Sequence, residues 1–240
     1  MNLNRAIGTV LRSNPLTAGL VPLIRARRRR EHDERLYRKY REFTMIPRAQ
    51  FLDNLDLCRR YGGREGAVVE CGVWRGGMVA AMAEVLGPER RYYLFDSFEG
   101  LPAADPAKDG ERAIQYQADT TGPSYHDNCR ADMAWAERAM ALAGARQAEL
   151  VRGWYRDTLP AFRTATPIAV FRLDADWYDS TLECLDALYP SVVAHGLILI
   201  DDYFTWDGCT KAVHHYLAKH VLPDRIRDSA NGVAYIVKGS

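Results

Sequence analysis

The chain has 240 residues, of which 48% are hydrophobic and 26% are charged, and this composition is ordinary for a soluble globular protein. The length suits one α/β domain with an extension better than two domains. The net charge of +1 gives no general electrostatic argument for nucleic acid as a partner.

Cysteine usage and hydropathy indicate the cellular compartment of the protein. Five cysteines are scattered along the chain without a Cys-x-x-Cys pair, which favours reduced thiols and argues against a zinc site. No apolar run has the length of a membrane span. The N-terminus also lacks the long apolar stretch and the cleavage site of a signal peptide. We therefore expect a cytoplasmic protein without stable membrane insertion.

The N-terminal region is predicted to form an arm and a helical extension over 1–47, and the main domain is predicted over 48–240. Residues 1–30 contain no acid and end in four consecutive arginines, 27–30. Such a run can bind anionic lipid or RNA, but acids follow it directly and a solvated segment is the commoner outcome. The extension could also cover a neighbouring subunit, which leaves a homo-oligomer open.

Strand-like and helical patterns alternate along the rest of the chain, which predicts a mainly parallel sheet with helices on both faces. Ser180, with Glu183 three residues on, predicts a capping box at one helix start. Strands are predicted over 67–71, 91–95, 148–151, 168–173 and 197–200. Helices are predicted over 31–43, 48–61, 76–86, 130–143, 180–189 and 210–220.

Two further segments complete the predicted fold. Residues 225–237 contain two short strand-like runs around Ala230-Asn231-Gly232 and predict a hairpin. A closing hairpin adds an antiparallel edge to a parallel sheet. The stretch 101–129 is polar, rich in glycine and proline, and longer than most connections, so we expect it to be a functional lid.

The first alternating unit carries an acid and a glycine turn, in the sequence Glu70-Cys71-Gly72-Val73-Trp74-Arg75-Gly76. Glycine lets the backbone approach a ligand closely, and the start of a helix offers free N–H groups. The spacing differs from the Gly-x-Gly-x-x-Gly of dinucleotide sites. A carboxylate beside the turn suits a cation, such as the amino-acid end of S-adenosylmethionine. We predict cofactor contacts at Glu70, Gly72 and Gly76.

The second strand ends in Asp96-Ser97-Phe98. Asp96 stands 96 − 70 = 26 positions after the acid of the first strand, near the place where an acid accepts hydrogen bonds from a ribose. The alternative is an aspartate that only caps a turn. Phe98 is a candidate for contact with adenine, with a core phenylalanine as the alternative. Together with the glycine turn, this segment favours a nucleoside cofactor.

Two later strands end in carboxylates, in the sequences RLDADWY (172–178) and LILIDDY (197–203). Carboxylates that face one another resist desolvation unless a cation or a proton holds them together. Oxygen-only ligands suit a hard cation such as Mg²⁺. A single aspartate would be interpreted as a loop acid or a helix cap. Three of them at two strand ends, Asp174, Asp201 and Asp202, favour a metal site.

All these acids end strands and should therefore face one crevice at the carboxyl edge of the sheet. A cofactor and a metal side by side suit the metal-assisted transfer of a group to a hydroxyl. The cation lowers the pKa of the hydroxyl, and a nearby carboxylate takes its proton. Asp176 is the candidate base. His214 and His215 are alternatives, although a helix pair of histidines more often has a structural role.

Six blocks of the sequence together resemble the macrocin O-methyltransferase family, of the TylF type, over roughly residues 45–237. They are VVECGVWRGG (68–77), FDSFEGLP (95–102), GWYRDTLP (153–160), RLDADWYDST (172–181), LYP (188–190) and LILIDDY (197–203). The resemblance implies a Rossmann-like class I methyltransferase fold with a seven-stranded, mostly parallel sheet. It also implies an enzyme that depends on S-adenosylmethionine and Mg²⁺ and methylates sugar hydroxyls of natural products.

The same resemblance assigns roles to particular residues. The metal ligands would be Asp174, Asp201 and Asp202, with Asp176 as the base. The cofactor contacts would be Glu70, Gly72, Asp96 and Ser97. The segment 105–129 departs from the family pattern, so the expectation for cofactor and metal is firmer than that for a particular small-molecule acceptor.

Three alternative functions stay open at this point. A metal-dependent methyltransferase of phenols or catechols would use a similar carboxylate cluster. A nicotinamide-dependent oxidoreductase is disfavoured because Gly-x-Gly-x-x-Gly is absent. A binding module without catalysis is disfavoured because every carboxylate of the pattern is present.

Overall fold

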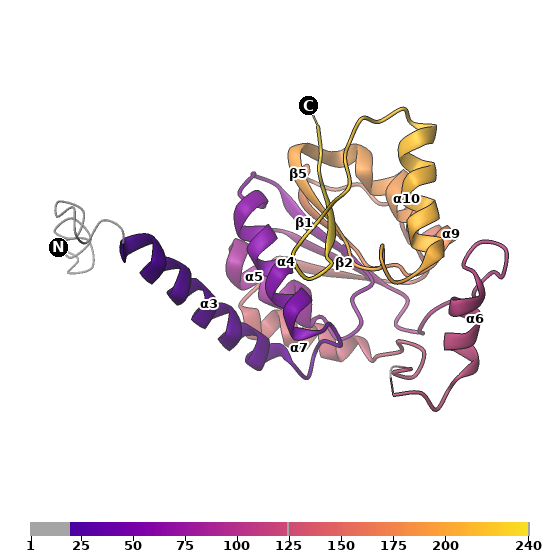
Figure 1. Ribbon diagram of the computed structural model, residues 1–240, viewed down its shortest axis with the longest axis horizontal. Coiled ribbons are helices and arrows are strands. Elements are labelled where there is room, and N and C mark those ends of the chain that lie inside the picture. The colour runs from indigo at the N-terminus through magenta and orange to yellow at the C-terminus, as the bar shows by residue number, and fades with distance from the viewer. Residues whose placement is uncertain (1–19, 124, 240) are drawn as a thin grey trace. The chain divides into compact units, whose positions relative to one another are not determined.

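The computed structural model describes residues 20–123 and 125–239 (Figure 1). Contacts divide the chain into two compact units, 1–39 and 40–240. The helix α3, Leu20–Tyr40, runs without interruption through the four arginines, so the helix predicted over 31–43 begins earlier than expected. Within it, Arg27 pairs with Glu31 at 2.8 Å, one turn away. The predicted arm over residues 1–19 lies outside the described residues.

The second unit is built on a seven-stranded sheet, as the family resemblance implies, and its strand order is β3-β2-β1-β4-β5-β7-β6. The first five strands are parallel, and the last two form the antiparallel hairpin at the edge. The strand order changes direction between β1 and β4: β2 and β3 lie on one side of this boundary, and β4 and β5 on the other. Open α/β sheets bind ligands at such a switch point. The strands are β1 Ala67–Cys71, β2 Tyr92–Asp96, β3 Ala148–Arg152, β4 Ile168–Leu173, β5 Val192–Ile200, β6 Arg227–Asp228 and β7 Ala234–Val237.

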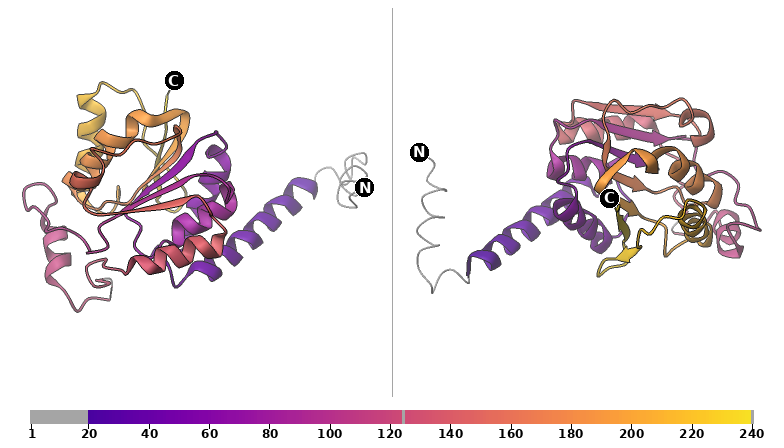
Figure 2. Two further views of the ribbon diagram at one scale, coloured as in Figure 1. Left: turned by 180° about the vertical axis from the view of Figure 1, so that it is seen from behind. Right: turned by 90° about the horizontal axis from the view of Figure 1, so that it is seen from above.

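Helices cover both faces of this sheet (Figures 1 and 2). The first group, α4, α5 and α7, packs together on one face, and α9 and α10 pack together on the other. Their bounds are α4 Arg48–Tyr61, α5 Gly77–Leu86, α6 Glu111–Ala118, α7 Met133–Ala143, α8 Tyr155–Thr158, α9 Tyr178–Leu188 and α10 Asp207–Lys219. The predicted capping box is wrong, because α9 begins at Tyr178 and Ser180 lies inside it, buried.

The two central strands, β1 and β4, are buried along their whole length. Their apolar residues form the core, as expected for parallel strands covered on both faces. Each strand also contains a charged residue, Glu70 in β1 and Arg172 in β4, and each is only 1% exposed. A core gains little from burying an ion pair instead of apolar side chains. These two residues therefore point to a site at this part of the sheet.

The stretch predicted as a lid, whose described residues are 101–123 and 125–129, contains the helix α6 and forms a cover. The carboxylate of Asp109, which is 3% exposed, accepts the backbone N–H of Tyr178 at 2.7 Å and so caps the start of α9. The indole of Trp177 donates to the carbonyl of Pro102 at 2.9 Å. These bonds hold the cover over the beginning of α9.

The compact unit begins at Tyr40, before the predicted domain start at residue 48. The segment 43–47 packs on α5, where the Phe43 carbonyl accepts the N–H of Gly77 at 2.9 Å. A side chain at Gly77 would place its Cβ 2.6 Å from that carbonyl oxygen, so glycine permits this approach.

Among the described residues, no helix combines the length and the apolar character that crossing a membrane requires.

Candidate active site

A cavity of about 460 Å³ lies at the carboxyl ends of β1, β2, β4 and β5. This is the place where an open α/β sheet binds its ligands. Eight of the ten site residues predicted from the sequence line it. They are Glu70, Gly72, Asp96, Ser97, Asp174, Asp176, Asp201 and Asp202.

The other two predicted residues, Gly76 and Phe98, are not among the described residues that line the cavity. Gly76 has φ +78° and caps α5, and a Cβ there would lie 3.0 Å from the Cα of Ala136 in α7. Phe98 also has a positive φ, of 57°, and is 6% exposed. In this structure both residues shape the loops around the cavity, and neither forms its wall.

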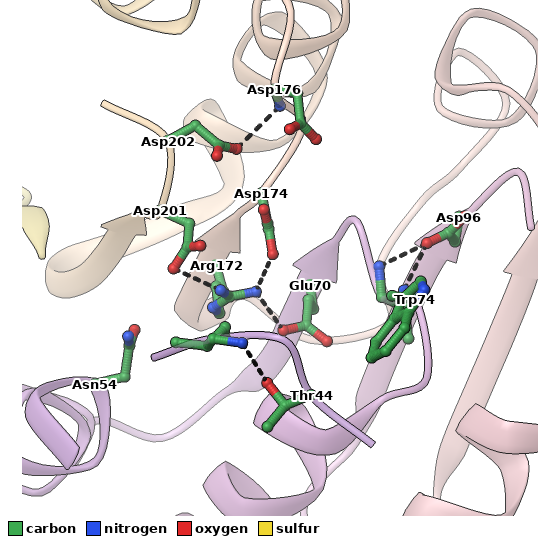
Figure 3. A network of polar contacts seen from close by, with 12 residues as sticks. Thr44, Asn54, Glu70, Trp74, Asp96, Arg172, Asp174, Asp176, Asp201 and Asp202 are labelled. Atoms are coloured by element: carbon green, nitrogen blue, oxygen red, sulfur yellow. Dashed lines mark hydrogen bonds and ion pairs between the residues drawn. The ribbon is translucent and has the colours of Figure 1, made fainter. Parts of the chain in front are cut away.

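The carboxylate of Asp96 fastens the glycine turn to the end of β2 (Figure 3). One oxygen accepts the backbone N–H groups of Val73 at 2.7 Å and Trp74 at 2.8 Å, and the other accepts that of Phe98 at 2.7 Å. Burial raises the pKa of Asp96, while these backbone bonds oppose the rise. The oxygen that accepts only the N–H of Phe98, Oδ1, keeps a lone pair for a ligand hydroxyl. The residue therefore orders the turn while it lines the cavity.

Gly72 allows the ends of β1 and β4 to touch. It has φ +85°, and a Cβ at this position would lie 1.6 Å from the backbone oxygen of Asp174. The backbone N–H of Asp174 also donates to the carbonyl of Cys71 at 2.9 Å. The glycine of the turn therefore sets the position of the first aspartate of the RLDAD sequence.

Arg172 lies at the centre of the acids, and the sequence analysis did not single it out (Figure 3). Its Nη1 contacts Glu70 Oε1 at 2.9 Å and Asp174 Oδ2 at 2.7 Å, and its Nη2 contacts Asp201 Oδ1 at 2.6 Å. The signal that could have found it is a charged residue in the otherwise apolar strand 168–173. One buried guanidinium thus joins three acids at the carboxyl ends of three neighbouring strands.

The acids around this arginine are in excess. Burial raises the pKa of Glu70 to about 8, with Arg172 opposing the rise and Asp174 adding to it. Burial likewise raises the pKa of Asp201 to about 6, again against the effect of the arginine. The second oxygen of Glu70, Oε2, is buried and has no hydrogen-bond partner within the described part of the chain. This group is therefore suited to a cationic ligand.

A second group of acids lies next to the first. Single carboxylate oxygens of Asp174, Asp176 and Asp202 lie within 4.8 Å of one another, which is close enough to share one cation. Burial raises the pKa of Asp176 and of Asp202 well above the usual range, and mutual repulsion among the acids adds to this. The structure thus groups two of the three predicted metal ligands with the predicted base. The third predicted ligand, Asp201, contacts the arginine.

Asp176 is held in an uncommon conformation. Its φ is +56°, a region that non-glycine residues seldom adopt outside functional sites and turns. Its backbone N–H donates to Asp202 Oδ2 at 3.0 Å, and its Oδ1 accepts from the indole Nε1 of Trp206 at 2.9 Å. The alternative bases, His214 and His215, pair with Tyr203 and Tyr178 and do not line the cavity.

Other walls of the cavity come from segments in which no site residue was predicted. The segment 43–47 and Gln50 of α4 form one wall. Aromatic side chains form another, where Tyr116 of α6 lies 5.4 Å from Trp206 between ring centroids. The guanidinium of Arg112 lies 5.3 Å from the same indole ring. Sequence periodicity does not reveal these residues, because the cover and the loop before α10 meet only in the fold.

Comparison with known proteins gives the family. The family model described as Macrocin-O-methyltransferase (TylF) matches residues 22–236. The chain is 36% identical over 187 residues to the 8-demethyl-8-(2,3-dimethoxy-alpha-L-rhamnosyl)-tetracenomycin-C 4'-O-methyltransferase of Streptomyces olivaceus, covering 74% of this chain and 69% of the relative. It is 31% identical over 188 residues to the mycinamicin III 3''-O-methyltransferase of Micromonospora griseorubida, covering 73% and 70%.

Solved structures agree with this assignment. The O-methyltransferase NovP superposes with a TM-score of 0.66 at 28% identity, covering 82% of this chain and 83% of that one. The calicheamicin methyltransferase CalS11 superposes with a TM-score of 0.63 over 88% and 92% of the two chains, and at 23% identity it supports the fold alone. The chain therefore belongs to the macrocin O-methyltransferase family and is an S-adenosylmethionine-dependent O-methyltransferase.

Proposed function

We propose that this enzyme methylates a sugar hydroxyl on a small natural product with the help of a divalent cation, Mg²⁺. The relatives support the sugar, since one is named for position 4' of a rhamnosyl compound and another for position 3'' of mycinamicin III. The observation that carries the proposal is the excess of buried and half-buried carboxylates at one cavity, with Glu70 on one side and the three grouped aspartates on the other.

The residues at the first strand end fit S-adenosylmethionine. The unpartnered Oε2 of Glu70 can accept a hydrogen bond from the ammonium group of the methionine part. Gly72 leaves room for a close approach to the backbone, and Oδ1 of Asp96 offers a lone pair to a ribose hydroxyl. Ser97, whose hydroxyl donates to the carbonyl of Gly100 at 3.1 Å, holds the turn beside it.

The grouped aspartates fit a hard divalent cation, because they supply only oxygen ligands. Asp174 and Asp202 belong both to the set expected from the sequence and to the group within 4.8 Å, so we assign them as ligands. The third carboxylate is Asp201, as the family resemblance implies, or Asp176, as the grouping favours. The variants Asp176→Asn and Asp201→Asn distinguish these two candidate ligands. Cation binding should be lost only in the variant that removes the true ligand.

The chain's own residues would act on the acceptor hydroxyl. When bound, the cofactor supplies an electrophilic methyl group and the cation lowers the pKa of the hydroxyl. If the cation takes Asp201 as its third ligand, Asp176 is free to accept the hydroxyl proton. Tyr116 and Trp206 would pack against an apolar face of the sugar and exclude water.

The aromatic wall also suits a flat phenol, which favours a second candidate function, the methylation of phenols or catechols. Tyr116, Trp154 and Trp206 all line the cavity. An acceptor screen should therefore include catechols beside deoxysugar glycosides. Turnover of the catechols alone would replace the sugar assignment.

The proposal is tested by calorimetry together with a methyl-transfer assay. S-adenosylhomocysteine is titrated into the protein, Mg²⁺ is titrated separately, and turnover is measured with Mg²⁺ and with a chelator. We expect both ligands to bind and turnover to require the cation. Undiminished turnover in the chelator would overturn the role of the cation, and absence of cofactor binding would overturn the site assignment.

Trp206→Phe should slow turnover by about 10- to 100-fold, because it removes the indole N–H that holds the Asp176 carboxylate at 2.9 Å. Phenylalanine keeps an aromatic ring at this position, although a smaller one, so acceptor packing should change little. Steady-state kinetics should therefore show a fall in kcat with KM for the acceptor nearly unchanged. A rise in KM with unchanged kcat would instead make Trp206 a binding residue only.

A further inference from the structure

The buried guanidinium of Arg172 connects the cofactor side of the proposed site with the metal side. Arg172 is 1% exposed and contacts Glu70, Asp174 and Asp201 at 2.6–2.9 Å (Figure 3). We propose that Arg172 is a positioning residue for two ligands at once, orienting Glu70 for the methyl donor and Asp174 for the divalent cation. This inference rests on the proposed function of the same site.

On the cofactor side, the arginine leaves one acid oxygen free. Its Nη1 donates a hydrogen bond to Oε1 of Glu70 at 2.9 Å, while Oε2 is buried without a partner among the described residues. A carboxylate held at one oxygen has a fixed orientation, so its other oxygen is presented to the ligand in a single direction. Without the guanidinium, Oε1 of Glu70 would lose this hydrogen bond, and the carboxylate would no longer be held in that direction.

On the cation side, Asp174 belongs to both groups of acids. Its Oδ2 accepts from Nη1 of Arg172 at 2.7 Å, and an oxygen of the same carboxylate lies within 4.8 Å of oxygens of Asp176 and Asp202. Carboxylates that bind metal ions are commonly oriented by hydrogen bonds from outer residues, and loss of such a partner weakens metal binding about 10- to 100-fold. Arg172 is in the position of that partner.

The geometry requires arginine and not only a positive charge. The three acids follow or end three adjacent strands, β1, β4 and β5, and one planar group reaches them all. Guanidinium has donors in a fixed fork, whereas the ammonium of lysine is a compact charge at the end of a flexible chain. Arg172→Lys keeps the charge and removes this simultaneous contact.

The experiment compares two separate binding measurements in a set of variants. S-adenosylhomocysteine is titrated in the presence of a chelator, and Mg²⁺ is titrated in the absence of cofactor. Arg172→Lys is expected to weaken each by roughly tenfold. Glu70→Gln should weaken only the first, and Asp202→Asn only the second. Arg60→Lys, at an exposed pair with Asp56 on α4, is the matched control and should change neither.

The outcomes separate this inference from the function on which it rests. A wild-type protein that binds neither ligand overturns the proposed function. A wild type that binds both, with an Arg172→Lys variant that loses one affinity or none, overturns the positioning role alone.

Thermal unfolding and chemical rescue separate this role from a purely structural one. Arg172→Ala should recover part of both affinities when guanidinium ion is added at a concentration that does not denature the wild type. Recovery of both supports the inference. Recovery of neither, or failure of both variants to fold with and without guanidinium, makes Arg172 a residue of the folding core and overturns the inference.

Discussion

Asp202→Asn is expected to reduce methyl transfer by about a thousandfold, because loss of the cation removes several kcal/mol of stabilisation from the reaction. The change is nearly isosteric. The new amide oxygen can still accept the N–H of Asp176, which Asp202 Oδ2 now accepts at 3.0 Å. Binding of S-adenosylhomocysteine should therefore stay within about twofold of wild type. Single-turnover kinetics and calorimetry give the two values.

The same variant should be more stable than the wild type when no cation is present. Asp202 is 7% exposed and lies among other acids, so burial and repulsion raise its pKa well above the usual range and its ionised form destabilises the fold. Removing the acid should raise the melting temperature by about 2–4 °C. Asp228→Asn, at an exposed residue of β6, is the control and should change neither activity nor melting. Wild-type activity of Asp202→Asn would exclude this residue as a cation ligand.

Gly72→Ala is expected to destabilise the protein by about 3–5 kcal/mol, from backbone strain together with overpacking. The glycine has φ +85°, and an added Cβ would lie 1.6 Å from the backbone oxygen of Asp174. The end of β1 or of β4 must move, and the cofactor pocket should move with it. Chemical denaturation measures the loss of stability, and titration of S-adenosylhomocysteine measures the loss of binding.

Two other glycines separate the causes of this effect. Gly232 has φ +81° with no atom within 4 Å of an added Cβ, so Gly232→Ala should cost only the backbone strain, about 1–2 kcal/mol. Gly63 also has open space and lacks a positive φ, so Gly63→Ala should change stability by less than about 0.5 kcal/mol. If Gly72→Ala costs no more than Gly232→Ala, the approach of the two strand ends is not needed for stability.

The sheet could be predicted from the sequence because its central strands, β1 and β4, are buried and mostly apolar runs, and helical patterns separate the parallel strands. The strands β1 and β4 begin and end at the residues that the sequence indicates. The strand β5 begins earlier than predicted, at Val192, since its first half is partly exposed and includes His195 at φ +61°. An irregular, partly polar segment of this kind carries no clear periodic signal.

The acids of the site could be predicted for a related reason: a carboxylate directly after a buried strand has no role in the core. Arg172 could not be predicted in this way, since its partners come from three strand ends that only the fold brings together. The role of Asp96 in ordering the glycine turn is similar, because its backbone donors lie 22 and 23 positions earlier. Contacts between distant segments determine both roles, and a sequence pattern is local.

The packing of residues 43–47 on α5 has a consequence for how the enzyme can be divided or fused. This stretch, which precedes the whole sheet, supplies a wall of the cavity and is anchored by the Phe43 carbonyl on Gly77. A cut placed at the start of α4 would keep all seven strands and every acid of the site, yet it would leave that side of the cavity open to water. The smallest catalytic piece therefore extends further toward the N-terminus than the sheet and its helices alone suggest.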